Sequence, residues 1–174
     1  LQHELHSAVD DYYTIPAFKK KRCYNHANTM TLMLEKHEEV LTVEARAYDD
    51  GVAIRLIADG TGECDVERER TGFTIPRAAG QVYAMKYVFS YEDHYHPVPP
   101  CDMAQNTYAF PVLVDCGMGI WALYAEAAVF GDYGGSVLRS GEEEPMSLMV
   151  RQAPDQIGAT HTTYPVATPW RVVL

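Results

Sequence analysis

The segment VLTVEARAYDDGVAIRLIADG, residues 40–60, decides the fold. It contains two runs in which apolar residues tend to alternate with polar ones, and Asp49, Asp50 and Gly51 lie between them. An Asp-Gly pair between such runs is a strong hairpin signal, because glycine accepts the positive φ that tight turns need. The segment therefore predicts two antiparallel strands joined around Asp50-Gly51.

The same kind of pattern recurs along the rest of the chain. Further strands are predicted in TMTLMLE (29–35), QVYAMKYVFSYE (81–92), FPVLVDC (110–116), GIWALYAEA (119–127), SVLRSGEEEPMSLMVRQA (136–153, two strands) and TPWRVVL (168–174). ERERTGFTIP (67–76) reads as an exposed segment, and the proline-rich HYHPVPPCDMAQNT (94–107) as a loop. No amphipathic helix longer than about two turns is evident. Short strands punctuated by glycine and proline predict an all-β fold, an antiparallel β-sandwich.

The length of 174 residues suggests one domain that can bury a hydrophobic core. Residues 1–23 show no clean period and are predicted to form an irregular N-terminal segment. Residues 24–174 are predicted to form the β-sandwich domain. A chain that begins at Leu1 without methionine is consistent with a piece of a longer protein.

Composition excludes some classes of partner. Lys and Arg number 14 against 24 Asp and Glu, which gives a net charge of -10, so nucleic acid is not an expected partner because phosphate contacts need clustered cations. No apolar run approaches the roughly 20 residues that span a bilayer, so no membrane segment is expected. The four cysteines form no C-x-x-C pair, and a zinc knuckle is therefore not predicted.

Four motifs in a set order resemble one known family. They are YDDGVAIR (48–55), YEDHY (91–95), YAEAAVFGDYGG (124–135) and TPWRVVL (168–174). Together they resemble the N-terminal domain of glycoside hydrolase family 97, the α-glucosidase and α-galactosidase family. The resemblance implies a mutarotase-like β-supersandwich that packs on a catalytic (β/α)₈ barrel, and it is compatible with export to the periplasm or the cell exterior.

The chain departs from the family pattern in two places. The family domain has several strands before the region that matches Tyr24, so the resemblance implies a sandwich that is shortened at its N-terminus. In YNHAN, His26 stands where the family often has an acid.

The resemblance also assigns site residues. It implies that the barrel supplies the catalytic carboxylates, so no catalytic residue and no glycosidase activity are expected in this chain alone. By motif position, Glu126 would reach the active site and help to bind calcium in the full-length parent. Asp132 lies six positions further on, beyond a glycine, and joins Glu126 as a candidate for the wall of the substrate pocket. Trp170 and Arg171 would face the barrel, with Trp170 left exposed here.

Other interpretations of these acids and aromatic residues remain open. Glu126 is the only charged residue between Asp115 and Asp132, and an edge residue paired with an arginine such as Arg139 would explain it equally. Glu92, Glu126 and Asp132 are the best internal acids for a hydrolytic pair, although solvated or structural roles are favoured. Trp121 could stack on a sugar ring, but its position in a strand favours the core.

Two further hypotheses come from other classes of function. The chain could be a stand-alone carbohydrate-binding module of mutarotase-like fold. It could also be a small metal enzyme that uses His94, His96 and His161, although two histidines beside a proline are more typical of a plain loop. A surface left without its barrel and a missing set of strands would both favour a homo-oligomer.

Overall fold

The computed structural model describes residues 2–17, 19–103, 105–131, 133–141, 146–152 and 160–174. Within these ranges the chain is all-β, and its only helical element is the 3₁₀ helix η1 (Pro100–Asp102). No helix in them is both long and apolar enough to cross a bilayer. The strands are β1 (Gln2–Thr14), β2 (Arg22–Lys36), β3 (Glu39–Tyr48), β4 (Gly51–Ala58), β5 (Glu63–Val66), β6 (Gly72–Thr74), β7 (Val82–Ala84), β8 (His96–Val98), β9 (Thr107–Ala109), β10 (Val112–Gly117), β11 (Ile120–Ala127), β12 (Ser136–Ser140), β13 (Ser147–Gln152), β14 (Thr160–Thr163), β15 (Val166–Ala167) and β16 (Trp170–Val173).

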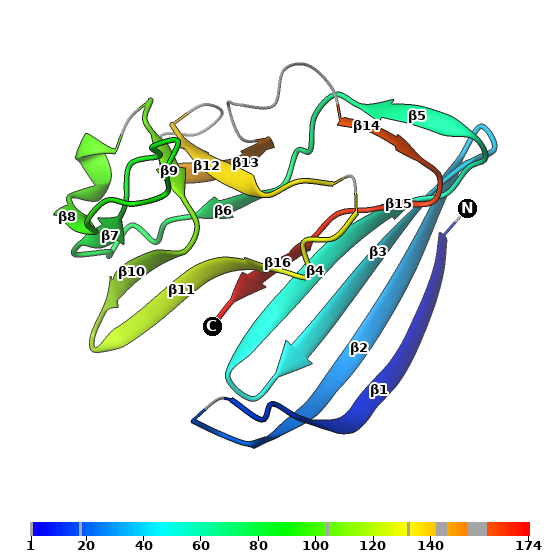
Figure 1. Cartoon of the computed structure of the whole chain (residues 1–174), viewed down its shortest axis with the longest axis horizontal. Coiled ribbons are helices and arrows are strands. Elements are labelled where there is room, and N and C mark those ends of the chain that lie inside the picture. The colour runs from blue at the N-terminus through cyan, green and yellow to red at the C-terminus, as the bar shows by residue number, and fades with distance from the viewer. Residues whose placement is uncertain (1, 18, 104, 132, 142–145, 153–159) are drawn as a thin grey trace.

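The strands form three antiparallel sheets. The large sheet has 10 strands in the order β1-β2-β3-β4-β16-β11-β10-β7-β8, with β15 also paired to β4. A 4-stranded sheet has the order β6-β13-β12-β9, and β14 pairs with β5 in a 2-stranded ribbon. Figure 1 shows the 4-stranded sheet beside β10 and β11, while β1, β2 and β3 extend away from it. The sandwich-like arrangement confirms the predicted fold class.

The central hairpin forms as predicted, but its glycine acts differently. β3 and β4 pair from Leu41 opposite Ala58 to Tyr48 opposite Gly51. Gly51 does not have a positive φ. A Cβ atom at Gly51 would lie 2.4 Å from the backbone oxygen of Val173, so the glycine is needed because β16 approaches closely.

The second predicted hairpin, β10–β11, is also confirmed. Leu113 lies opposite Leu123, and the turn consists of Gly117, Met118 and Gly119 with φ angles of 84°, 54° and 79°. All three residues are therefore in the left-handed region, which glycine adopts without steric cost. The predicted strands around residues 29–35, 136–153 and 168–174 are present as β2, β12 with β13, and β16, although residues 142–145 and 153 lie outside the described residues.

The prediction of an irregular segment at residues 1–23 is wrong for Gln2–Thr14. These residues form β1, which pairs with β2 from Gln2 opposite Leu34 to Thr14 opposite Arg22. β1 is an edge strand, and nearly all its described side chains are exposed. An edge strand exposed on both faces has no buried side to impose an alternating pattern, so its sequence carries no period-2 signal.

Two other segments differ from the prediction. The strand expected over residues 81–92 ends at Ala84, because β7 makes only a short pairing with β10; beyond it the chain keeps one isolated bridge, between Lys86 and Tyr108. The expected loop at residues 94–107 contains β8 and η1. The hydrophobic core lies between the large and the 4-stranded sheets, with Tyr108, Val114, Leu138 and Leu148 fully buried in it.

Candidate functional site

The TPWR motif places two neighbouring side chains on opposite faces of the large sheet. Trp170 packs against two arginines, with the guanidinium carbons of Arg46 and Arg55 at 4.5 and 4.6 Å from its ring centroid. Trp170 is therefore only 8% exposed, and the expectation of an exposed Trp170 is wrong. Arg55 lies on β4 and is fixed in turn by Glu44 of β3, at 2.5 Å. The hairpin that decides the fold thus also buries this tryptophan.

The prediction that Trp121 lies in the core is also wrong. Trp121 is 49% exposed, and its ring packs at a tilt against that of Tyr83, with ring centroids 5.9 Å apart. Alternation places Trp121 on the face of β11 opposite to Tyr124, and Tyr124 belongs to the core cluster. The pattern identified the strand correctly and assigned its buried face wrongly.

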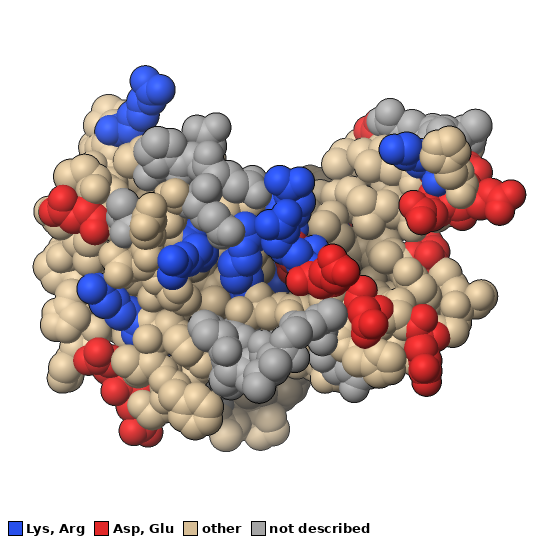
Figure 2. All heavy atoms as spheres, turned by 90° about the horizontal axis from the view of Figure 1, so that it is seen from above, with Lys and Arg blue, Asp and Glu red and all other residues tan. Residues whose placement is uncertain are grey.

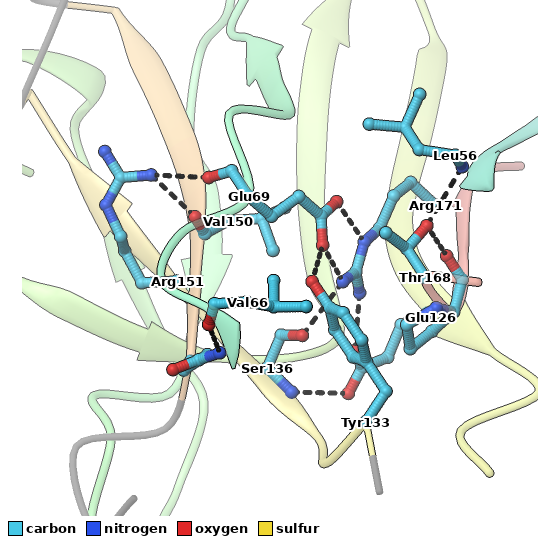
Figure 3. A network of polar contacts seen from close by, with 12 residues as sticks. Leu56, Val66, Glu69, Glu126, Tyr133, Ser136, Val150, Arg151, Thr168 and Arg171 are labelled. Atoms are coloured by element: carbon cyan, nitrogen blue, oxygen red, sulfur yellow. Dashed lines mark hydrogen bonds and ion pairs between the residues drawn. The ribbon is translucent and has the colours of Figure 1, made fainter. Parts of the chain in front are cut away.

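Arg171 lies at the centre of a charged network between the sheets (Figure 3). Its Nε donates to Oε1 of Glu69 at 2.9 Å, and its Nη2 to Oε2 of the same carboxylate at 2.5 Å. Its Nη1 donates to Oε2 of Glu126 at 2.7 Å. The side chains of Arg171, Glu69 and Glu126 are 2%, 3% and 14% exposed, so the first two are almost wholly removed from water.

Two neutral residues complete the network, which we call the Arg171 network (Glu69, Glu126, Tyr133, Ser136 and Arg171). The Tyr133 hydroxyl donates to Oε2 of Glu69 at 2.7 Å. Ser136 accepts from Nη2 of Arg171 at 3.0 Å, and its backbone N–H donates to Oε1 of Glu126 at 3.1 Å. Glu126 and Arg171 belong to the large sheet, whereas Ser136 begins β12 of the 4-stranded sheet. The network therefore joins the two sheets.

Glu126 is paired with an arginine, but not with the one suggested from the sequence. Arg139 donates to the Thr107 hydroxyl at 2.9 Å. Glu126 lies directly opposite Arg171 in the β11–β16 pairing, which explains why these two side chains meet. A carboxylate can remain in this largely apolar strand because a guanidinium and a backbone N–H both bind it.

Burial and charge act in opposite directions on the two buried ions of the network. Desolvation would raise the pKa of Glu69, but hydrogen bonds and charge from Arg171, with further hydrogen bonds from Tyr133 and Thr71, outweigh it and hold that pKa below its usual value. Desolvation would also lower the pKa of Arg171, yet Glu69 and then Glu126 raise it. Burial, followed by the charge of Glu69, raises the pKa of the Tyr133 phenol. The network therefore stabilises the carboxylate form of Glu69, the guanidinium form of Arg171 and the neutral phenol of Tyr133.

The lowered pKa of Glu69 predicts a loss of stability in acid. Because the unfolded chain binds the proton near the ordinary value of 4.5 and the folded chain only at lower pH, the contribution is complete well above pH 4.5 and is lost as the pH falls through the folded pKa. We expect the free energy of unfolding from urea titrations to fall less between pH 6 and pH 3 in Glu69→Gln than in the wild type. Equal pH dependence of the two proteins would contradict this assignment.

A cleft with a volume of ≈ 630 Å³ borders the Arg171 network. Glu69 and Tyr133 line it, together with apolar residues and a charged segment; the other lining residues are Leu41, Leu56, Ala58, Cys64, Asp65, Val66, Glu67, Arg68, Arg70, Tyr164, Val166 and Thr168. Figure 2 shows Lys and Arg side chains gathered beside Asp and Glu side chains on the upper face of the molecule. Tyrosine rings and charges of both signs give this cleft a composition that suits a polar ligand.

The described residues do not fit a calcium ion. Calcium takes 6 to 8 oxygen ligands, but both oxygens of Glu126 already accept hydrogen bonds, and one of the donors is a guanidinium 2.7 Å away. No group of three or more His, Cys, Asp or Glu residues suited to a metal occurs in the described part of the chain. Calcium binding by Glu126 in a longer parent, with ligands from elsewhere, stays a prediction.

The remaining candidate residues are dispersed. The rings of His94 and His96 are 6.4 Å apart beside β8, whereas His161 lies on β14 and pairs with Asp65 at 2.7 Å, so the three are not gathered into one metal site. Glu92 is exposed. Asp132 lies outside the described residues, so its predicted place in the pocket wall stays a prediction.

The sequence does not indicate Glu69, the most deeply buried carboxylate among the described residues. Glu69 lies in ERERTGFTIP, whose alternating charges indicated an exposed segment, yet Glu69 is only 6% exposed. Tyr133 and Ser136 were also not identified. The two-residue spacing of Glu67 and Glu69 would put them on the same side of an extended chain, yet only Glu69 is buried, so alternation gave no signal for it.

The fold and the site define a β-sandwich domain with an ionic network between its sheets. The family described as Glycosyl-hydrolase 97 N-terminal matches residues 1–174, the whole of the chain. The chain therefore belongs to this family: it is an N-terminal domain of a glycoside hydrolase of family 97, as its motifs indicated.

Individual relatives agree with this assignment. The chain is 25% identical over 175 residues to a retaining alpha-galactosidase of Bacteroides thetaiotaomicron, covering 92% of this chain and 24% of that protein. A beta-arabinopyranosidase crystal structure superposes with a TM-score of 0.86 at 26% identity, covering 98% of this chain and 31% of that one. The structure of a family 97 enzyme from Pseudoalteromonas sp. strain K8, in complex with acarbose, superposes with a TM-score of 0.81 at 19% identity. The match covers 98% of this chain and 27% of that one. The chain thus spans about a quarter to a third of the relatives that it matches.

Proposed function

We propose that this domain is non-catalytic and braces a catalytic (β/α)₈ barrel in a parent α-glycosidase, with Glu126 as one wall of the substrate pocket. The observation that carries the proposal is the match of the whole chain to the family of N-terminal domains, in relatives that are about three to four times longer. The names of those relatives, an alpha-galactosidase and a beta-arabinopyranosidase, support a pyranoside as the substrate of the parent.

The proposed contribution of the domain is positional. Arg171 holds one oxygen of Glu126 and the Ser136 backbone N–H holds the other, so that the carboxylate is fixed in one orientation at the end of β11. Charged groups that are fixed in advance support catalysis better than mobile ones, because no reorganisation is needed when substrate binds. Trp170, which packs on two arginines, and Arg171, which is buried in the network, stabilise the sheet. The expected contact of these two residues with a barrel stays a prediction.

An activity assay tests whether the chain is catalytic by itself. We expect the purified chain to release no p-nitrophenol from p-nitrophenyl α-glucoside or p-nitrophenyl α-galactoside above the buffer rate. Glu69 and Glu126, two carboxylates that the structure brings together, both bind Arg171 between the sheets instead of flanking an open site. Turnover that copurifies with the chain and disappears in Glu126→Gln would overturn the proposal.

One observation favours carbohydrate binding by the domain as a second function. Trp121 and Tyr83 form an aromatic surface on the large sheet, and Trp121 is half exposed. Flat aromatic faces suit the C–H groups of a pyranose ring. Titration calorimetry with panose and galactose would detect such binding, and Trp121→Ala would abolish it. Absence of heat at millimolar sugar would exclude this second function for those sugars.

A further inference from the structure

The two carboxylates of the Arg171 network hold Arg171 unequally. Glu69 binds in the bidentate manner, with one oxygen on Nε and the other on Nη2. Glu126 makes a single bond, to Nη1. Bidentate pairing between a guanidinium and a carboxylate is the stronger and more directional arrangement. Arg171 would therefore keep its main partner if Glu126 moved or bound another group.

The charges of this cluster do not balance. Glu69 and Glu126 are two carboxylates, and the contacts described for them come from one cation, Arg171, and from neutral donors. Arg151, the other arginine labelled in Figure 3, donates to the backbone oxygen of Glu69 at 3.2 Å. The two carboxylates therefore share one guanidinium, and Glu126 has the smaller share of its hydrogen bonds.

Glu126 is also the most exposed of the three charged side chains. The Glu126 side chain is 14% exposed, against 3% for Glu69 and 2% for Arg171. Glu126 is thus the outermost member of the cluster, where the cost of burying a charge is smallest. The bond from Tyr133 and the two bonds to Arg171 account for both oxygens of Glu69, which is consequently fixed from two sides.

We infer that Glu69 is a positioning residue for Glu126: it holds Arg171 through two hydrogen bonds and so fixes the guanidinium in the orientation in which Nη1 binds Glu126. Tyr133 supports this role by orienting Glu69. The functional part of this inference rests on the proposed function, in which Glu126 forms the pocket wall. Its structural part concerns the isolated chain and can be measured separately.

Nuclear magnetic resonance of the ¹⁵N-labelled chain tests the structural part. The Arg171 Nε–H resonance is assigned by its disappearance in Arg171→Lys. We expect its hydrogen exchange to be nearly unchanged in Glu126→Gln and faster by about tenfold or more in Glu69→Gln, because only Glu69 accepts from Nε. Equal acceleration in the two variants, or acceleration in Glu126→Gln alone, would overturn the unequal pairing.

Steady-state kinetics of the parent enzyme test the functional part. Tyr133→Phe retains both carboxylates and removes only the hydroxyl that orients Glu69, so it is expected to fold even where Glu69→Gln does not. We expect Tyr133→Phe to lower kcat/KM about threefold to tenfold, in the same direction as Glu126→Gln. The inference would be overturned if kcat/KM fell in Glu126→Gln but not in folded Tyr133→Phe or folded Glu69→Gln. If kcat/KM did not fall in Glu126→Gln, the proposed function would be overturned instead. The hydrogen exchange of the Arg171 Nε–H would still decide whether the pairing is unequal.

Discussion

Replacing Arg171 by methionine is expected to lower the free energy of unfolding by about 3–5 kcal/mol, because it leaves two buried carboxylates without their cation. Methionine has a similar length and no charge, so the change isolates the electrostatic loss from a change in volume. The loss is a large part of the total stability of a typical domain, which is about 5–15 kcal/mol. Urea unfolding at neutral pH, followed by circular dichroism, measures it.

Arg139→Gln is the matched control for this variant. Arg139 is a partly buried arginine on the adjoining sheet, whereas Arg171 is fully buried, and the described hydrogen bond of Arg139 goes to the neutral hydroxyl of Thr107. We expect this control to lose about 1 kcal/mol or less. If Arg171→Met cost no more than Arg139→Gln, the network between the sheets would not contribute to stability in the way that its geometry indicates.

The second large effect is expected for Trp170→Ala, at about 3–5 kcal/mol. Removing the indole deletes a large buried group and also removes the ring against which the guanidinium groups of Arg46 and Arg55 pack. Trp121→Ala serves as the control, since Trp121 is half exposed and its loss is expected to cost about 1 kcal/mol or less. Thermal unfolding of both variants should therefore give clearly different midpoints.

The opposite ranking of the two tryptophan variants would contradict the structure. It would mean that Trp121 belongs to the core and that Trp170 lies on a free surface, as their sequence surroundings indicated. Measurement on the isolated chain gives the clearest comparison, because no other domain then alters the burial of either tryptophan.

Local signals predicted the hairpins well and the edges of the sheets poorly. Asp50-Gly51 and Gly117–Gly119 mark turns whose neighbours pair with each other, so the sequence contains all that is needed to place them. β1 has no such signal, because it is an edge strand with few buried side chains. β7 was overestimated in length because alternation continues through residues 81–92 although β10 pairs with only part of it.

The candidate site was only partly accessible from the sequence for a similar reason. Glu126 stood out as a single charge in an apolar strand, and Arg171 stood out within TPWR. Glu69 is separated from Arg171 by 102 residues and lies in a segment with no regular structure, so no local pattern connects them. Long-range ion pairs depend on how the sheets stack, and a single sequence does not contain that information directly.

The most direct test of the proposed function is the kcat/KM of the parent enzyme carrying Glu126→Gln. Glu44→Gln is the control, because it removes a carboxylate from an arginine pair on the opposite face of the large sheet. If Glu126 forms the pocket wall, kcat/KM for an α-glycoside should fall on the order of 100-fold in Glu126→Gln and remain near the wild-type value in Glu44→Gln. Unchanged kcat/KM in a folded Glu126→Gln enzyme would contradict a role for this domain in the active site.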